Sequence, residues 1–440
     1  MISDGLAGRA GAGQKPKSTI FTANMPPPLP ILLASVLKPL DDTRMLGKFG
    51  RTLAARPGAQ VHVAGRAAPQ PAGLPANLYT HALLAGSRLS LARLGAQLRY
   101  WQLLRKLRPG VVFVHAPELL PATMLWQVLG RGRRFVYDVR ENYALNIQTQ
   151  QVYPGWARGL LARLVRGLET LAVRRASAVV LAERSYAEEL PFAVSAQNEQ
   201  GGSGLAQAEA HTPSAPEKSR AKNQKPILIL ENKYQPYIPD IPEPAPPLLP
   251  RRLPPPTEPL RLLYSGTISE LNGVWEAIRF VQHLRAAWPL AHLTIIGACQ
   301  QPGLLPRLHA AVAAAGGAVT LLGGAELVPH ARVVAEIGRS HLGLLPYRPH
   351  PSTARCVPTK LFEYLAHGLP LVAPPNPLWQ QLVQRHGAGF SFDFQQAAYP
   401  PAAELADWLR QPAYYPHGIP PEAFWASEAE KLHGLLDSIR

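Results

Sequence analysis

Lys360 and Glu363 are three residues apart in a segment whose pattern predicts a helix, and this spacing places both side chains on one face near the helix start. Pro358 can open that helix because its missing N–H is one that a first turn leaves unbonded in any case. A cation beside a helix N-terminus suits an anionic phosphate, and a neighbouring carboxylate can accept hydrogen bonds from sugar hydroxyls. The alternative is an ordinary surface ion pair on an amphipathic helix, and the spacing alone leaves both open.

The helix that carries this pair belongs to a longer alternation of strands and helices. Leu361, Tyr364 and Leu365 recur at helical spacing, and Gly368 ends the helix before a short apolar strand. Continuous apolar strands alternating with helices indicate parallel sheets covered on both faces, with ligands at the carboxyl ends of the strands. The predicted strands are 31–36, 61–64, 111–115, 134–139, 178–182 and 226–230 in a first series, and 260–264, 293–296, 319–322, 342–345, 369–373 and 389–392 in a second. We therefore predict an α/β protein of two Rossmann-like domains that face a central cleft.

Composition suggests where these domains begin and end. The chain has 440 residues, enough for two ordinary domains, and its 47 prolines exceed what compact α/β domains hold. The predicted parts are a disordered N-terminus at 1–28, a first domain at 29–235 with a disordered polar insert at 195–224, a proline-rich linker at 236–259, a second domain at 260–420, and a C-terminal helix at 421–440.

The pattern P-x-K-x-x-E-Y-x-A-x-G-x-P-x-V-A over 358–373 resembles the donor-site signature of GT-B glycosyltransferases, in particular the retaining enzymes of glycosyltransferase family 4. The resemblance covers most of 30–235 and 258–440. It implies that Lys360 faces the phosphates of a nucleotide-sugar and that Glu363 binds the ribose. It also implies that the last helix, near 422–439, crosses back to the first domain.

The resemblance extends to the strand and turn at 263–268, where Gly266 allows backbone N–H groups to approach the donor pyrophosphate. Three positions depart from the family pattern: Thr267 and Asn272 replace basic residues, and Arg355 replaces a sugar-contacting glutamate. Arg355 either restores the lost positive charge near the phosphates or is an exposed loop arginine, and both interpretations stay open. The candidate donor-binding residues are Gly266, Thr267, Arg355, Lys360, Leu361 and Glu363.

In the first domain, the segment 137–143 resembles the Tyr-Asp-x-His-Glu element of the same family, with Arg140 in place of the histidine. The resemblance places Asp138 and Glu141 at the cleft, where they would position an acceptor hydroxyl. Alternatively, Asp138 caps the following segment and Glu141 pairs with Arg140. His115, at the end of its strand, is a further cleft candidate, although such a histidine is more often structural.

Positive charge is concentrated in the first domain. The net charge is +16, and residues 1–195 hold 25 Lys and Arg against 10 Asp and Glu. Two predicted helices, 88–107 and 156–175, combine apolar stripes with arginines, and Trp101 stands beside Arg99, Arg105 and Lys106. These helices either bind an anionic membrane surface or present a solvated basic face. Nucleic acid is a weaker partner, because no DNA- or RNA-binding motif is present.

The remaining features concern compartment and cofactors. The two cysteines, Cys299 and Cys356, lie far apart, and we expect a cytoplasmic protein at the inner face of the membrane, without signal peptide or spanning segment. We expect no metal and no cofactor. The predicted function is sugar transfer, with retention, from a nucleotide-sugar to a glycan or lipid-linked acceptor in cell-surface polysaccharide or glycoconjugate synthesis. The alternative is a catalytically decayed GT-B-fold binding or scaffold protein, which the substitutions at Thr267, Asn272, Arg355 and Arg140 favour.

Overall fold

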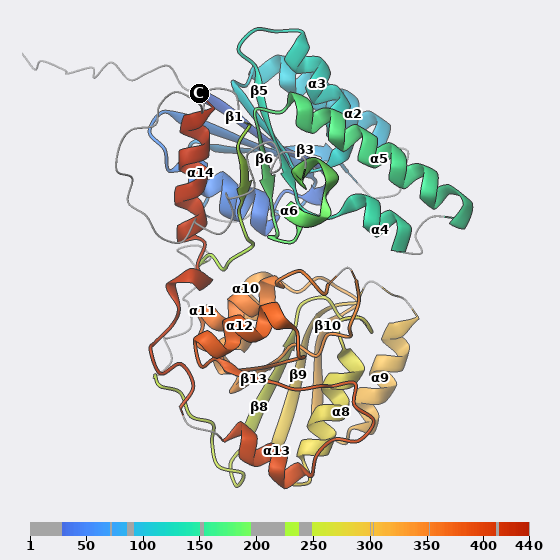
Figure 1. Ribbon diagram of the computed structural model, residues 1–440, viewed down its shortest axis with the longest axis vertical. Coiled ribbons are helices and arrows are strands. Elements are labelled where there is room, and N and C mark those ends of the chain that lie inside the picture. The colour runs from blue at the N-terminus through green and yellow to red at the C-terminus, as the bar shows by residue number, and fades with distance from the viewer. Residues whose placement is uncertain are drawn as a thin grey trace, which may run out of the picture.

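The computed structural model describes residues 29–70, 73–85, 92–149, 154–194, 225–236, 249–299, 301, 303–351, 353–410 and 413–439. The N-terminus predicted to be disordered, the insert at 195–224 and residues 237–248 of the predicted linker lie outside the described residues. The described chain forms two α/β units, one above the other in Figure 1, and each is built on a wholly parallel sheet.

The first sheet has seven strands in the order β3-β2-β1-β4-β5-β6-β7. Its strands are β1 (Leu29–Pro39), β2 (Ala59–Arg66), β3 (Leu78–Leu84), β4 (Val111–Val114), β5 (Arg134–Val139), β6 (Ala178–Leu181) and β7 (Ile227–Ile229). The helical elements between them are η1 (Thr43–Gly50), α1 (Arg51–Ala54), α2 (Ala92–Leu107), η2 (Pro117–Leu119), α3 (Leu120–Val128), α4 (Tyr143–Thr149), α5 (Gly155–Arg175) and α6 (Tyr186–Glu189). All neighbouring strands run parallel, as the continuous apolar strand sequences predict.

Helices cover both faces of this sheet because alternate residues of each strand point to opposite sides. On β1, Leu32 and Ala34 face a core shared with α2, α3 and α5. Ile31 and Leu33 face the opposite core, which η1, α1 and the C-terminal helix α14 (Ala426–Ser438) complete. Figure 1 shows α2, α3 and α5 together on one side of the sheet and α14 on the other.

The second sheet has six parallel strands in the order β10-β9-β8-β11-β12-β13. Its strands are β8 (Leu260–Ser265), β9 (Ala291–Ala298), β10 (Val319–Gly324), β11 (Leu342–Leu344), β12 (Leu371–Ala373) and β13 (Gly389–Ser391). Its helices are α8 (Val274–Leu284), α9 (Leu304–Ala314), α10 (His330–Arg339), α11 (Thr359–Ala366), α12 (Pro377–Arg385) and α13 (Ala402–Leu409). Two separate cores lie on its faces, one under α8, α9 and α13 and the other under α10, α11 and α12.

Two crossings of the chain between the domains lie side by side. Tyr234, which follows β7, pairs with the segment that leads into α14: its N–H donates to the Ala423 carbonyl at 2.8 Å, and its carbonyl accepts from the Trp425 N–H at 2.6 Å. The Trp425 indole then donates to the Thr52 hydroxyl at 2.9 Å in the first domain. The C-terminal helix therefore packs on the first domain, although the residues just before it belong to the second.

The predicted architecture of two parallel Rossmann-like sheets is confirmed. Strand β3 was not predicted, because its polar Tyr79, Thr80 and His81 suit an edge strand and break the apolar run. The segment Thr43–Gly50 forms a π-helix, and Asp42 caps it by accepting from the Arg44 and Met45 N–H groups. No helix within the described ranges is both long enough and apolar enough to cross a lipid bilayer.

Candidate active site

A pocket lies between the two domains, at the carboxyl ends of both sheets. The first domain contributes η1 and the start of α1, the second contributes the first turns of α10 and α11, and the connection after β7 lies between them. The lining residues are Thr43, Gly47, Lys48, Arg51, Tyr234, Gln235, Pro236, His330, Thr359 and Glu363. The space between these residues, open solvent included, is about 440 Å³.

Lys360 is held in the first turn of α11 by aromatic rings and by a glycine turn. Its ammonium nitrogen lies 4.9 Å from the ring centroid of Tyr264 and 5.4 Å from that of Tyr347. Burial lowers the pKa of Lys360 to about 8, although the Glu363 charge acts in the opposite direction. No carboxylate among the described residues forms an ion pair with this ammonium group, so its charge stays available to an anionic ligand.

Gly266 follows β8 directly and lies against Lys360. Its φ of +91° is in the left-handed region, and a Cβ at this position would be 2.5 Å from Lys360 Cε. The Ser265 hydroxyl lies 2.9 Å from the Tyr364 hydroxyl, which ties the end of β8 to α11. The structure thus brings together the glycine turn and the lysine that the sequence marks as phosphate-binding, and only glycine fits between them.

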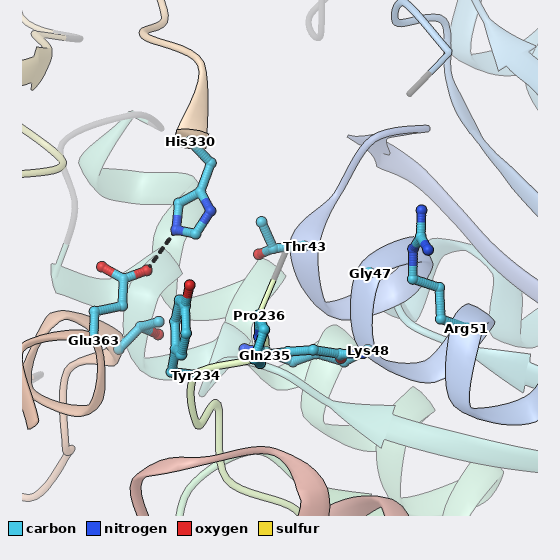
Figure 2. A pocket seen from close by; sticks show the side chains of 10 residues that line it. Thr43, Gly47, Lys48, Arg51, Tyr234, Gln235, Pro236, His330 and Glu363 are labelled. Carbon is cyan, nitrogen blue, oxygen red and sulfur yellow. Dashed lines mark hydrogen bonds and ion pairs between the residues drawn. The ribbon is translucent and has the colours of Figure 1, made fainter. Parts of the chain in front are cut away.

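Glu363 is one turn further along α11 and accepts a hydrogen bond from His330 Nε2 at 2.8 Å (Figure 2). Burial alone would raise the pKa of Glu363, but the bond from His330 and the charge of Lys48 lower it overall. Burial would lower the pKa of His330, and its bond to Glu363 raises it instead. The carboxylate is therefore held ionised at the pocket wall, a state in which both of its oxygens act only as acceptors.

Leu361 lies between these two residues in sequence but not at the pocket. Its side chain is fully buried in the second-domain core, packed with the apolar side of α11. Leu361 therefore positions the helix, whereas Glu363 lines the pocket and Lys360 lies against the Gly266 turn, outside the set of lining residues.

The second-domain residues that depart from the family pattern form contacts within the chain itself. The Asn272 amide donates to the Thr267 carbonyl at 2.9 Å, and the same carbonyl accepts from the Tyr264 hydroxyl at 2.9 Å. Arg355, half exposed, forms an ion pair with Glu188 of the first domain. Thr267 and Asn272 thus close the glycine turn by neutral hydrogen bonds, and Arg355 contributes to the contact between domains.

A second link between the domains lies beside Arg355. The backbone N–H of Val357 donates to Glu183 Oε2 at 3.1 Å, just after β6 of the first domain. Burial raises the pKa of Glu183 to about 8, and the nearby Glu231 acts in the same direction. The loop that leads into α11 is therefore attached to the first domain on both sides of Cys356.

Asp138 and His115 lie beneath the cleft surface, and both side chains are fully buried. Arg44 donates to both oxygens of Asp138, at 2.7 and 3.0 Å, and His115 Nδ1 lies 2.6 Å from Asp138 Oδ2. Burial alone would raise the pKa of Asp138, but the Arg44 charge and the bond to His115 hold it far below its usual range. The predicted direct contact of Asp138 and His115 with an acceptor is therefore not offered by this geometry, because Arg44 occupies the carboxylate.

Arg140 and Glu141 lie closer to the cleft, and each has its own partner. Arg140 donates to both oxygens of Asp42 at 2.9 and 3.0 Å, and Glu141 accepts from Lys38 at 2.9 Å and from Asn146 at 3.1 Å. The alternative pairing of Glu141 with Arg140 is not formed. Glu141 stays partly exposed, with 39% of its side chain accessible, whereas Asp138 and His115 are fully buried.

Lys48 and His330 line the pocket and were not singled out from the sequence. Lys48 is nearly buried, its ammonium group lies 3.3 Å from Asn232 Oδ1, and burial lowers its pKa to about 7 with a further decrease from Arg44. The sequence did contain one signal for both residues, because each lies just after the carboxyl end of a strand. Lys48 lies between two glycines after the first strand, and His330 follows Pro329 after β10.

No protein-family model matches this sequence, and no curated protein matches it. Solved structures do resemble the fold. A sucrose-phosphate synthase from Thermosynechococcus elongatus superposes with a TM-score of 0.53 at 16% identity, covering 93% of this chain and 96% of that one. WaaG, a glycosyltransferase involved in lipopolysaccharide biosynthesis, gives 0.53 at 15%, covering 92% and 100%. HepE from Anabaena, in complex with UDP and glucose, gives 0.53 at 16%, covering 93% and 99%.

These neighbours are GT-B glycosyltransferases, and at such low identity the likeness concerns the fold alone. This chain has the GT-B fold, as the sequence resemblance implies. The chemistry must be argued from the pocket itself.

Proposed function

We propose that this chain transfers a sugar from a nucleotide-sugar to an acceptor hydroxyl. The observation that carries the proposal is the contact of Lys360 with the Gly266 turn, one helical turn from Glu363, which lines a pocket between two domains. A buried cation beside an open backbone turn fits a diphosphate, and the ionised carboxylate fits the ribose hydroxyls. HepE, of the same fold, was solved with UDP and glucose, which supports a donor of this class.

In the proposed reaction, the bond from the anomeric carbon to the diphosphate oxygen breaks, and that oxygen leaves with the electron pair. The acceptor oxygen bonds to the same carbon from the same face, and its proton passes to the departing diphosphate, so the configuration is retained. Lys360 and the N–H groups at the start of α11 stabilise the negative charge that develops on the leaving group. We assign this charge stabilisation to side chains and backbone, without a metal ion.

The acceptor is proposed to enter from the first domain, where the Glu141 side chain is partly exposed. A glycan or lipid-linked glycan presents several hydroxyls, and Glu141 and the nearby Asn146 amide can orient one of them. WaaG acts in lipopolysaccharide biosynthesis, which supports a role for this chain in making a cell-surface glycan or glycoconjugate.

The rival function is a binding or scaffold protein that has lost donor chemistry. Thr267 and Asn272 favour it, because they stand where basic residues would neutralise a diphosphate, and Arg355, which could have restored that charge, is paired with Glu188. The two functions differ in whether the pocket binds a nucleotide and in whether the sugar leaves it.

A thermal-shift panel of UDP-, GDP- and ADP-sugars tests the proposal. We expect one nucleotide to stabilise the protein, since a ligand at about 100 times its Kd adds about 2.7 kcal/mol. Lys360→Met should abolish the shift, and release of nucleoside diphosphate should persist in EDTA. Stabilisation by no member of the panel would favour the scaffold. Stabilisation without diphosphate release in the presence of glycan or lipid-linked acceptors would favour a nucleotide-binding protein.

A further inference from the structure

The outer surface of α5 is apolar where a soluble helix is usually polar. Trp156 is 86% exposed, and Leu160, Leu164 and Leu171 follow it at spacings of four, four and seven residues, so all lie on one face. The inward face of the same helix holds Ala162, Glu169, Ala172 and Val173, all buried. Helix α5 thus has an inward face that is buried and an opposite apolar face that the described part of the chain leaves exposed.

Neighbouring helices extend this surface. On α3 and just after it, Leu125, Val128 and Leu129 are exposed, and α3 packs against α5. On α2, which packs against α3, Leu94 and Leu98 are exposed. Of the fourteen large apolar residues exposed in the described chain, nine lie on this side of the first sheet. Patches of this extent usually mark a surface that meets a partner.

Arginines are interspersed with the apolar residues. Arg163, Arg174 and Arg175 are exposed on α5, and Arg131 follows α3. Residues 92–175 contain 14 Lys and Arg against 4 Asp and Glu, and of these acids Asp138 and Glu169 are fully buried. An apolar helix face beside uncompensated arginines matches the boundary of an anionic lipid bilayer, where acyl chains meet phosphate headgroups.

The structure changes which tryptophan can take part. Trp101, the expected anchor on α2, is partly buried against the first-domain core, and Arg99 donates to the Leu83 carbonyl at 2.6 Å. Trp156, at the start of α5, is exposed instead. An indole at the end of an amphipathic helix is suited to the headgroup level.

We propose that α5, with α3 and α2 beside it, is a docking surface for an anionic lipid bilayer. It is separate from the donor site, so it does not depend on the proposed function. It is nevertheless connected to the acceptor side of the cleft: Arg166 of α5 donates at 2.6 Å to the side chain of Asn142, which follows Glu141. In Figure 1, α4 lies between α5 and the second domain, so a docked α5 would bring the mouth of the cleft close to the lipid surface.

Vesicle sedimentation tests the surface. We expect the full chain to pellet with phosphatidylcholine vesicles that contain phosphatidylglycerol, and not with phosphatidylcholine alone. The double variant Leu160→Ser/Leu164→Ser should lower partitioning at least tenfold. Its matched control, Leu290→Ser/Leu378→Ser, removes two exposed leucines of the second domain and should leave it unchanged. Arg163→Gln, Arg174→Gln and Arg175→Gln should each lower it about fivefold.

Fluorescence locates the contact on α5. Brominated anionic lipid should quench part of the tryptophan emission, and Trp156→Phe should remove most of that quenching. Trp408→Phe, at a tryptophan of the second domain that is 38% exposed, should not. Glu363→Ala should bind vesicles like the unmodified chain, and the α5 variants should keep the nucleotide-induced thermal shift. These two results together distinguish a loss of vesicle binding at α5 from a loss of nucleotide binding at the donor site.

Three results would overturn the docking surface. Equal pelleting with neutral and anionic vesicles would remove the role of the arginines, and no pelleting would remove the membrane. Self-association that Leu160→Ser/Leu164→Ser abolishes, without vesicle binding, would assign the face to a second copy of the chain.

Discussion

The two sides of the cleft use charge differently. In the second domain, Lys360 is held between aromatic rings without an ion-pair partner among the described residues, and Glu363 has only a histidine. In the first domain, three cleft-side ion pairs form within the protein, Arg44 with Asp138, Arg140 with Asp42, and Lys38 with Glu141, and the exception is Lys48, whose ammonium group lies beside the neutral Asn232 side chain. The difference indicates that Lys360 and Lys48 keep charge for a ligand, whereas the paired residues of the first domain use charge to hold its own strands and helices.

The contrast has an energetic basis. A buried charge without a partner of opposite charge lowers the stability of the folded protein. Such a charge is retained where a bound ligand supplies the opposite charge. The lowered pKa values of Lys48 and Lys360 express that cost, since burial disfavours their charged forms. The bidentate pair of Arg44 and Asp138 leaves no such deficit, so its role is structural.

The largest expected effect is on stability, from Asp138→Ala. Removing this carboxylate leaves the buried Arg44 without its counter-ion, which should lower the free energy of unfolding by about 3–5 kcal/mol in urea denaturation. Asp407→Ala, at an exposed carboxylate of α13, should leave stability unchanged. A loss below about 1 kcal/mol for Asp138→Ala would show that the pair is not structural and would remove the contrast between the domains.

Next in size is the effect of Lys360→Met on transfer. Methionine keeps the packing between Tyr264 and Tyr347 but removes the charge, so kcat/KM should fall by about 10²–10³ with unfolding unchanged. The control is Lys431→Met on α14, where the ammonium group pairs with Glu428. Full activity in Lys360→Met would mean that the second domain does not reserve this charge for the donor.

A smaller effect is expected from pH. The free protein has pKa values of about 7 at Lys48 and about 8 at Lys360, and a bound diphosphate favours the charged forms and raises both. Affinity should therefore be highest below pH 7 and fall as pH rises through 7 and 8, by up to about tenfold per pH unit for each lysine.

Calorimetry in two buffers of different ionisation enthalpy measures this coupling directly. Near pH 8, diphosphate binding should take up protons, and Lys360→Arg should remove the part that belongs to Lys360, since a guanidinium stays charged. Proton release on binding, or an affinity that increases with pH, would contradict the assignment of these lysines to the diphosphate.

The structure brings the predicted donor residues Gly266 and Lys360 into contact, whereas it buries the predicted acceptor residues Asp138 and His115, and the difference follows from separation along the chain. Lys360 and Glu363 share one helix, and Gly266 ends a strand of the same sheet, so a local motif brings them together. Lys48 and His330 meet only because two domains close on one pocket, which no local pattern encodes. The sequence does not show whether a carboxylate at a strand end faces solvent or is buried against another side chain. The partner of Asp138 lies 94 residues away, so no local pattern indicates that this carboxylate is buried.

The fold could be predicted because its signal is repeated many times along the chain. Alternating apolar strands and helices predict parallel sheets even where one element, such as β3, is missed. The exposed leucines of α5 could not be recognised in this way, since the same spacing is typical of a helix that packs on a sheet, and only the structure shows which face is covered.

The most direct test of the central claim is titration calorimetry of the stabilising nucleoside diphosphate against Glu363→Ala. The account predicts that this variant folds normally and binds about 10–100-fold more weakly, because the hydrogen bonds from the ribose to a charged carboxylate are lost. Glu404→Ala, at an exposed carboxylate of α13, should bind like the unmodified chain. Equal affinity in Glu363→Ala and the unmodified chain would place the nucleotide elsewhere and contradict the account.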